Sequence, residues 1–135
     1  MTVIGTPLKR KEDPKLLTGE GKYVDDIHAP GELWMGMVRS TMAHATIDGV
    51  DTSAAAGMPG VHAVYTGPQL MDMGLWAAPL PCAWPVTPDM VNPAHYPVAT
   101  GEVHHVGEII SVVLADTRAR AADAAEQVEV SYGPL

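Results

Sequence analysis

The chain has 135 residues, of which 47% are hydrophobic and 18% are charged, a composition that excludes an intrinsically disordered tail. Its formal net charge of −8 argues against nucleic acid or an anionic membrane surface as a partner. The sequence contains no run of about eighteen consecutive apolar residues, so we predict no insertion into a membrane.

The length fits one domain, residues 1–135, that is large enough to bury its own core. The first residues lack the apolar segment of a secretory signal. The single cysteine, Cys82, has no partner for an internal disulfide, which fits a reducing compartment. We therefore expect a cytoplasmic protein.

The first half of the chain predicts three strands and one helix. An apolar run at residues 33–38 predicts a strand. A strand–helix–strand unit follows, with a strand at 45–50, a short alanine-rich helix at 52–58 and a strand at 61–66. Asp51 is the predicted N-cap of this helix, because its carboxylate can accept from the free amides of the first turn. Pro59 and Gly60 are predicted to end the helix.

The segment from about residue 68 to residue 100 predicts a long irregular loop. It contains seven of the twelve prolines, which remove hydrogen-bond donors and restrict the backbone. A long loop of this kind within one domain usually has a function or a partner. We predict an interaction surface here because the loop holds several large apolar side chains, namely Trp76, Trp84, Leu75, Leu80 and Val86. Self-association of the isolated chain is a further expectation.

The last third of the chain predicts a second strand–helix–strand unit. Residues 109–115 form an apolar run with Ser111 as its only polar member, which is typical of a strand buried on both faces. Asp116 is the predicted cap of a helix from about residue 117 to residue 127. Residues 128–132 alternate between apolar and polar side chains and predict a strand with one solvated face. If paired strands of a unit were parallel within one sheet, the crossover would be right-handed.

Several motifs occur in an order that resembles a known domain family. The resemblance extends from Gly5 to Leu135 and is weakest in the proline-rich segment. The motifs are, in order, residues 10–27, Pro30-Gly31, Val38-Arg39-Ser40, Ala43-His44-Ala45, Pro59-Gly60-Val61, Val106-Gly107-Glu108 and the final block from Ala122 to Leu135. This order is similar to the N-terminal domain of the molybdenum-binding large subunit in the xanthine dehydrogenase and aldehyde oxidase superfamily. Within it the match is closest to the carbon monoxide dehydrogenase type.

The resemblance implies an α+β fold, the α/β hammerhead, with a mixed sheet and helices packed against it. It also implies a parent enzyme that hydroxylates its substrate at a molybdenum–pterin cofactor. The implied partners are the remaining domains of the large subunit and iron–sulfur and flavin subunits, and the implied substrates are carbon monoxide, aldehydes or N-heterocycles. The motifs of the pterin-binding domains are absent, so we assign no catalytic, cofactor-binding or metal-binding residue and predict that this fragment alone is inactive. A free-standing hammerhead interaction module is the alternative.

Arg39 and His44 are the polar candidates for an interface. One interpretation places them at a contact with another subunit or domain. The other pairs Arg39 with Asp26 or Asp51 and gives His44 the role of satisfying buried backbone groups, and it is favoured because motifs in folding domains often mark turns and packing.

No metal or phosphate site is predicted from the sequence. The chain has six histidines but no His-x3-His or Cys-x2-Cys spacing. His104 and His105 would point to opposite faces of a strand and could not bind one ion together. The segment Gly19 to Lys22 lacks the first glycine and the final hydroxyl residue of a phosphate-binding loop.

Overall fold

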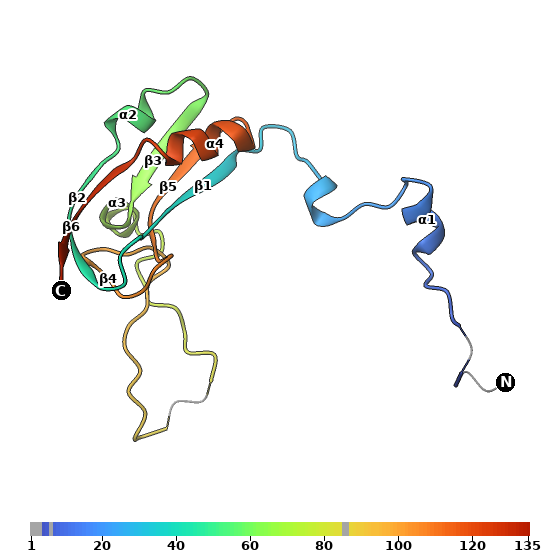
Figure 1. Cartoon of the computed structure of the whole chain (residues 1–135), viewed down its shortest axis with the longest axis horizontal. Helices are drawn as coiled ribbons and strands as arrows, with labels where there is room; N and C mark the ends of the chain where they lie inside the picture. The colour runs from blue at the N-terminus through green and yellow to red at the C-terminus, as the bar shows by residue number, and fades with distance from the viewer. Residues whose placement is uncertain (1–3, 6, 85–86) are drawn as a thin grey trace. The chain divides into compact units, whose positions relative to one another are not determined.

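The computed structural model describes residues 4–5, 7–84 and 87–135, and Figure 1 shows its secondary structure. The chain divides into two compact units, Met1–Glu32 and Leu33–Leu135. The first unit contains a short helix, α1 (Asp13–Leu17), and a 3-10 turn, η1 (Val24–Asp26). All strands of the described residues belong to the second unit. Among these residues, no helix has the length and apolar character needed to cross a membrane.

The strands of the second unit form two three-stranded sheets in which every pairing is antiparallel. One sheet has the order β1–β5–β3, and the other has the order β4–β2–β6. The bounds are β1 (Trp34–Arg39), β2 (Ala45–Asp51), β3 (Val61–Thr66), β4 (Glu102–Val103), β5 (Ile109–Ala115) and β6 (Glu129–Pro134). The predicted α+β hammerhead class is confirmed, whereas the strands form two antiparallel sheets and not one mixed sheet.

Each strand–helix–strand unit connects the two sheets. The first runs from β2 through α2 (Ser53–Ala56) to β3, and the second runs from β5 through α4 (Arg118–Ala125) to β6. A parallel crossover within one sheet needs a dozen or more residues, which the short α2 connection does not supply. β5 already has the antiparallel neighbours β1 and β3 on its two edges. The condition for a right-handed parallel crossover is therefore not met.

The helix caps differ in part from the prediction. Thr117, and not Asp116, caps α4: its hydroxyl accepts a hydrogen bond from the Arg120 amide at 3.2 Å. Thr117 has an extended backbone, so the helix begins one residue later than expected, and Asp116 instead forms an ion pair with the Arg120 side chain. Asp51 does accept from a first-turn amide, that of Ser53, at 2.9 Å, although Thr52 is the residue at the cap position.

Asp51 leads to a prediction about acid stability. The pKa of this carboxyl lies below its ordinary value of 3.8, because the Ser53 hydroxyl and then the Ser53 amide hydrogen-bond to the ionised form. A carboxyl with a lowered pKa in the folded state stabilises the fold above that ordinary value, and the contribution disappears as the pH falls through the lowered pKa. We expect Asp51→Asn, which keeps an acceptor but cannot titrate, to lose less unfolding free energy on acidification below about pH 4. Urea denaturation at several pH values measures this, and equal acid losses would contradict it.

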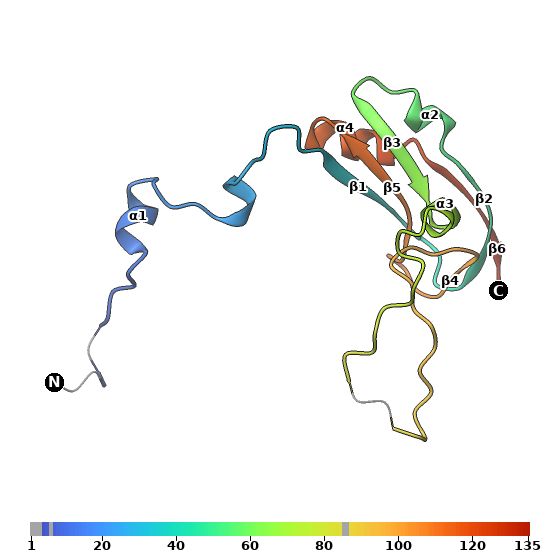
Figure 2. The same cartoon turned by 180° about the vertical axis from the view of Figure 1, so that it is seen from behind.

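The core surrounds β5. Val113, in the middle of this strand, is 0% exposed and packs with Val38, Ala124 and Val128, so this face of the sheet lies under α4. Figure 2 shows α4 lying across the β1, β5 and β3 strands. The neighbouring residue Val112 points to the opposite face and packs with Leu70. The prediction of a strand buried on both faces is confirmed.

A helix occurs within the segment that was predicted to be irregular. α3 (Gly67–Asp72) begins directly after β3 with a reciprocal capping box between Thr66 and Gln69 and with Pro68 in its first turn. The spacing Thr-x-x-Gln with an early proline is a helix-start pattern, so the prediction of an irregular segment from residue 68 is wrong over α3. The residues from Met73 onward up to β4 contain no further helix or strand among those described.

Candidate interaction site

Arg39 lies at the junction of two motifs that are far apart in the sequence. It ends β1, and its Nη1 atom donates to the Gly107 carbonyl at 2.8 Å. Next to it, the Ser40 amide donates to the Glu108 carbonyl and the Gly107 amide donates to the Ser40 carbonyl, both at 2.8 Å. The predicted pairing of Arg39 with Asp51 is therefore wrong, whereas the alternative partner, Asp26, lies in the other compact unit, and that pairing stays a prediction. Arg39 holds the Gly107–Glu108 turn against the end of β1.

His44 forms part of an exposed polar cluster. Its side chain is 53% exposed, and its Nε2 atom lies 3.8 Å from Glu102 Oε2. The His104 Nε2 atom lies at the same distance from the same oxygen, and the two imidazole rings stack with centroids 5.9 Å apart. The alternative in which His44 satisfies buried backbone groups is wrong, because its ring lies at the surface. The His44 ring is therefore accessible to another protein surface.

Glu108 anchors this cluster from within the fold. Its side chain is only 6% exposed, and its Oε2 atom accepts from the His104 amide at 2.5 Å. The Nδ1 atoms of His104 and His105 lie 3.5 and 3.7 Å from that oxygen. The expectation that these two rings face opposite sides of a strand is wrong, because β4 ends at Val103 and both residues lie in the following turn. The described residues contain no group of three His, Cys, Asp or Glu side chains that could hold a metal ion.

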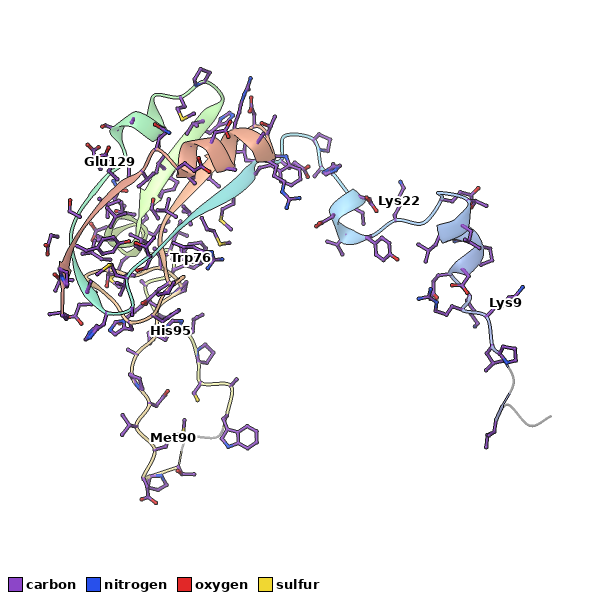
Figure 3. The ribbon with its side chains drawn as sticks, viewed as in Figure 1. Lys9, Lys22, Trp76, Met90, His95 and Glu129 are labelled. Carbon is purple, nitrogen blue, oxygen red and sulfur yellow. The ribbon has the colours of Figure 1, made fainter. Side chains whose placement is uncertain are left out.

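The apolar candidates lie on the proline-rich segment. Trp84 is 76% exposed, and Trp76, Leu75 and Leu80 also expose large parts of their side chains, whereas Val86 lies outside the described residues. The two limbs of the segment are joined by a hydrogen bond from the Leu80 amide to the His95 carbonyl at 2.7 Å. Figure 3 shows Met90 at the far end of this loop and Trp76 and His95 closer to the sheets. The loop therefore displays apolar groups away from the core.

The structure does not bring all candidates together. No hydrogen bond, ion pair or ring contact joins Trp76 or Trp84 to Arg39 or His44 among the described residues. Two surfaces result. We call Leu75, Trp76, Leu80 and Trp84 the loop surface, and we call Arg39, His44, Glu102 and His104 the polar surface. The sequence indicated the loop surface and, of the polar surface, Arg39 and His44. It did not indicate Glu102 and His104, which come close to His44 because β2 pairs with β4.

A third exposed region follows the outer edge of β1. A groove of about 700 Å³ lies between β1, α4 and β6 and is lined in part by Met35, Met37, Ala122, Ala125 and Tyr132. Among the residues that the structure describes, β1 pairs with β5 alone, so β1 is an edge strand of its sheet. The sequence did not indicate the groove, because the apolar run at residues 33–38 is equally typical of a buried strand.

Comparisons with known proteins agree with this architecture. Residues 18–135 match the family model described as aldehyde oxidase and xanthine dehydrogenase, a/b hammerhead domain. The chain is 42% identical over 127 residues to the nicotine 6-hydroxylase large subunit of Paenarthrobacter nicotinovorans, covering 93% of this chain and 15% of the relative. It is 40% identical over 125 residues to the carbon monoxide dehydrogenase large chain of Hydrogenophaga pseudoflava, covering 93% and 14%.

The fold also matches solved structures. Quinoline 2-oxidoreductase from Pseudomonas putida 86 superposes with a TM-score of 0.84 at 36% identity, over 98% of this chain and 16% of that chain. This chain thus spans about 15% of the length of the curated relatives that it matches. The chain belongs to the aldehyde oxidase and xanthine dehydrogenase family, in whose large subunits it corresponds to the α/β hammerhead domain.

Proposed function

We propose that this chain acts in the cytoplasm as the N-terminal structural and assembly domain of a molybdenum hydroxylase large subunit. The parent enzyme would oxidise carbon monoxide, an aldehyde or an N-heterocycle. The observation that supports an assembly role is the loop surface. Its two tryptophans and two leucines are each between 46% and 76% exposed and lie outside the hydrophobic core. Exposed apolar groups gathered on one segment usually mark a contact with another protein surface.

In this proposal the molybdenum–pterin cofactor is held by other domains of the parent subunit and not by this chain. Among the described residues no His, Cys, Asp or Glu group is arranged for a metal, and the buried carboxylate of Glu108 already accepts from the His104 amide. We therefore assign the chemistry to other domains and derive no catalytic step for this chain. Its proposed partners are the remaining domains of the large subunit together with iron–sulfur and flavin subunits.

An exchange of domains tests this proposal. In a chimeric large subunit, residues 1–135 of this chain replace the matching segment of the Hydrogenophaga pseudoflava carbon monoxide dehydrogenase large chain, to which they are 40% identical. We expect the chimeric large subunit to assemble with its partner subunits and to retain molybdenum. A soluble, folded chimeric large subunit that fails to assemble would contradict the proposal and favour the free-standing interaction module.

The loop surface should be needed for that assembly. We expect Trp76→Ser together with Trp84→Ser to reduce the yield of assembled complex at least tenfold, because buried aromatic side chains are often the main contributors to an interface. The paired control, Trp76→Phe with Trp84→Phe, keeps apolar aromatic groups and should assemble nearly as well as the parent. Size-exclusion chromatography gives the yield. Equal yields from the serine and phenylalanine pairs would remove the loop surface from the interface.

A further inference from the structure

A pocket of about 390 Å³ lies beside the polar surface. It is formed where β2, β4 and the turn after β4 meet the end of the proline-rich segment. The described residues that line it include Glu102, Glu108, His104 and Tyr96 but no lysine or arginine. We call it the carboxylate pocket, because it has two carboxylates and no permanent positive charge of its own.

Glu108 brings an unpaired carboxylate oxygen to this pocket. Its side chain is 6% exposed, and its Oε2 atom accepts from the His104 amide. Among the described residues, no hydrogen bond or ion pair reaches its other oxygen, Oε1. That part of the chain also contains no fully buried side-chain oxygen without a hydrogen-bond partner, so Oε1 is accessible from outside. Because Glu108 lines the carboxylate pocket, this access leads through the pocket.

The two carboxylates of the pocket lie on either side of one imidazole. The His104 Nε2 atom is 3.8 Å from Glu102 Oε2, and its Nδ1 atom is 3.5 Å from Glu108 Oε2. A neutral imidazole donates a single N–H, so His104 in that form cannot satisfy both carboxylates. A charged group that is largely removed from water is costly unless it is paired. A cation that entered the pocket would therefore be attracted by both carboxylates.

Backbone hydrogen bonds hold the walls of the pocket in place. The Ala99 amide donates to the Ile109 carbonyl at 2.7 Å, and the Ile47 amide donates to the Gly101 carbonyl at 2.8 Å. Thr46, which also lines the pocket, is paired with Glu102 where β2 meets β4. A pocket with walls fixed in this way needs little ordering when a ligand enters, and this favours binding.

We propose that the carboxylate pocket receives an arginine side chain from an adjacent protein surface of the parent enzyme. This inference rests on the proposed function, which places the chain in such an enzyme. A guanidinium has five N–H donors in one plane, so it can contact Glu102 and Glu108 together, and its flat face suits an aromatic ring such as that of Tyr96. The exposed His44 ring lies beside Glu102, so a protein surface that contacts His44 also covers the pocket.

Titration of the 135-residue chain with N-acetylarginine methylamide tests the pocket directly. At about pH 8, where histidine is ordinarily neutral, we expect saturable NMR shifts of the Glu102, His104 and Glu108 amides. N-acetyllysine methylamide should bind about threefold more weakly or less, because an ammonium is a point charge without the planar donors. The absence of saturable shifts at these amides would overturn the proposal. Tighter binding of the lysine probe would overturn the assignment to arginine.

Single substitutions test which groups hold the probe. Glu108→Gln keeps an acceptor for the His104 amide but has no charge, so it should weaken binding roughly tenfold. Glu102→Gln changes a half-exposed side chain, leaves the core intact and should weaken binding about threefold. Glu129→Gln is the matched control, because it removes the same charge from an exposed position of β6 outside the pocket. An equal loss of binding in Glu129→Gln would show a general charge effect and contradict the proposal.

The chimeric large subunit shows whether a protein surface supplies the arginine. There, Glu102→Gln with Glu108→Gln should lower the yield of assembled complex roughly tenfold, since an arginine would lose both carboxylates. Asp123→Asn with Glu129→Gln removes two exposed charges outside the pocket and should leave the yield unchanged. If the chimeric large subunit assembles equally well with both pairs, the pocket proposal is wrong and the proposed function stands. A folded chimeric large subunit that does not assemble without any of these substitutions would overturn both.

Discussion

Replacing Val113 with alanine will lower the free energy of unfolding by roughly 2–3 kcal/mol. Val113 is 0% exposed in the middle of β5, the central strand of its sheet, and it packs with residues from β1 and α4 and with Val128. Removing its two methyl groups loses their burial and leaves a cavity, since two strands and a helix enclose the site. The loss should be among the largest for any single truncation in the chain.

Chemical denaturation of the 135-residue chain, followed by tryptophan fluorescence and circular dichroism, measures this loss. Val106→Ala is the matched control, because Val106 is largely exposed and its truncation should change stability by less than about 0.5 kcal/mol. Thr117→Ala removes the cap of α4 and should cost about 1 kcal/mol. A Thr117→Ala loss larger than that of Val113→Ala would show that β5 is not the core strand. The absence of a cooperative transition would show that the domain needs its parent to fold.

The elements with strong local periodicity could be predicted from the sequence. The continuous apolar run of β5 and the alternation of Val128, Val130 and Tyr132 against Glu129 and Ser131 both appear in the structure as expected, with the first three at least half-buried and the other two exposed. These patterns depend only on which face of a strand meets the core. Their partners could not be predicted in the same way, because pairing of β5 with β1 and of β2 with β6 is decided by contacts between residues far apart in the chain.

The candidate site, too, could be predicted from the sequence only where its features are local. The sequence indicated the tryptophans of the loop surface because large apolar groups in a proline-rich segment stand out locally. The contact of Arg39 with Gly107 joins residues 68 positions apart, and no spacing rule relates them. The sequence contains both motifs, and only the fold shows that they form one structure. Polar clusters of this kind depend on the register of the strands. Glu102 lies close to His44 because it is paired with Thr46 where β4 meets β2.

Gly36 provides the second large effect, because β1 and α4 approach each other closely there. A Cβ atom at Gly36 would stand 2.3 Å from the Ala121 carbonyl oxygen and 2.9 Å from its carbonyl carbon. Both atoms belong to the backbone of α4, so no side-chain rotation can relieve the overlap, and the helix would have to move away from the sheet. We expect Gly36→Ala to destabilise the domain by roughly 3 kcal/mol through this overpacking.

Gly49 in β2 offers a matched control for this substitution. A Cβ atom there would meet nothing within 4 Å, so Gly49→Ala should be neutral or slightly stabilising, since alanine restricts the unfolded chain. Urea denaturation compares the two variants, and hydrogen exchange should locate the damage of Gly36→Ala in the amides of α4, which lose their packing against β1. If Gly36→Ala proved as stable as Gly49→Ala, the helix would lie farther from β1 than the structure places it, and the groove between β1, α4 and β6 would have a different shape.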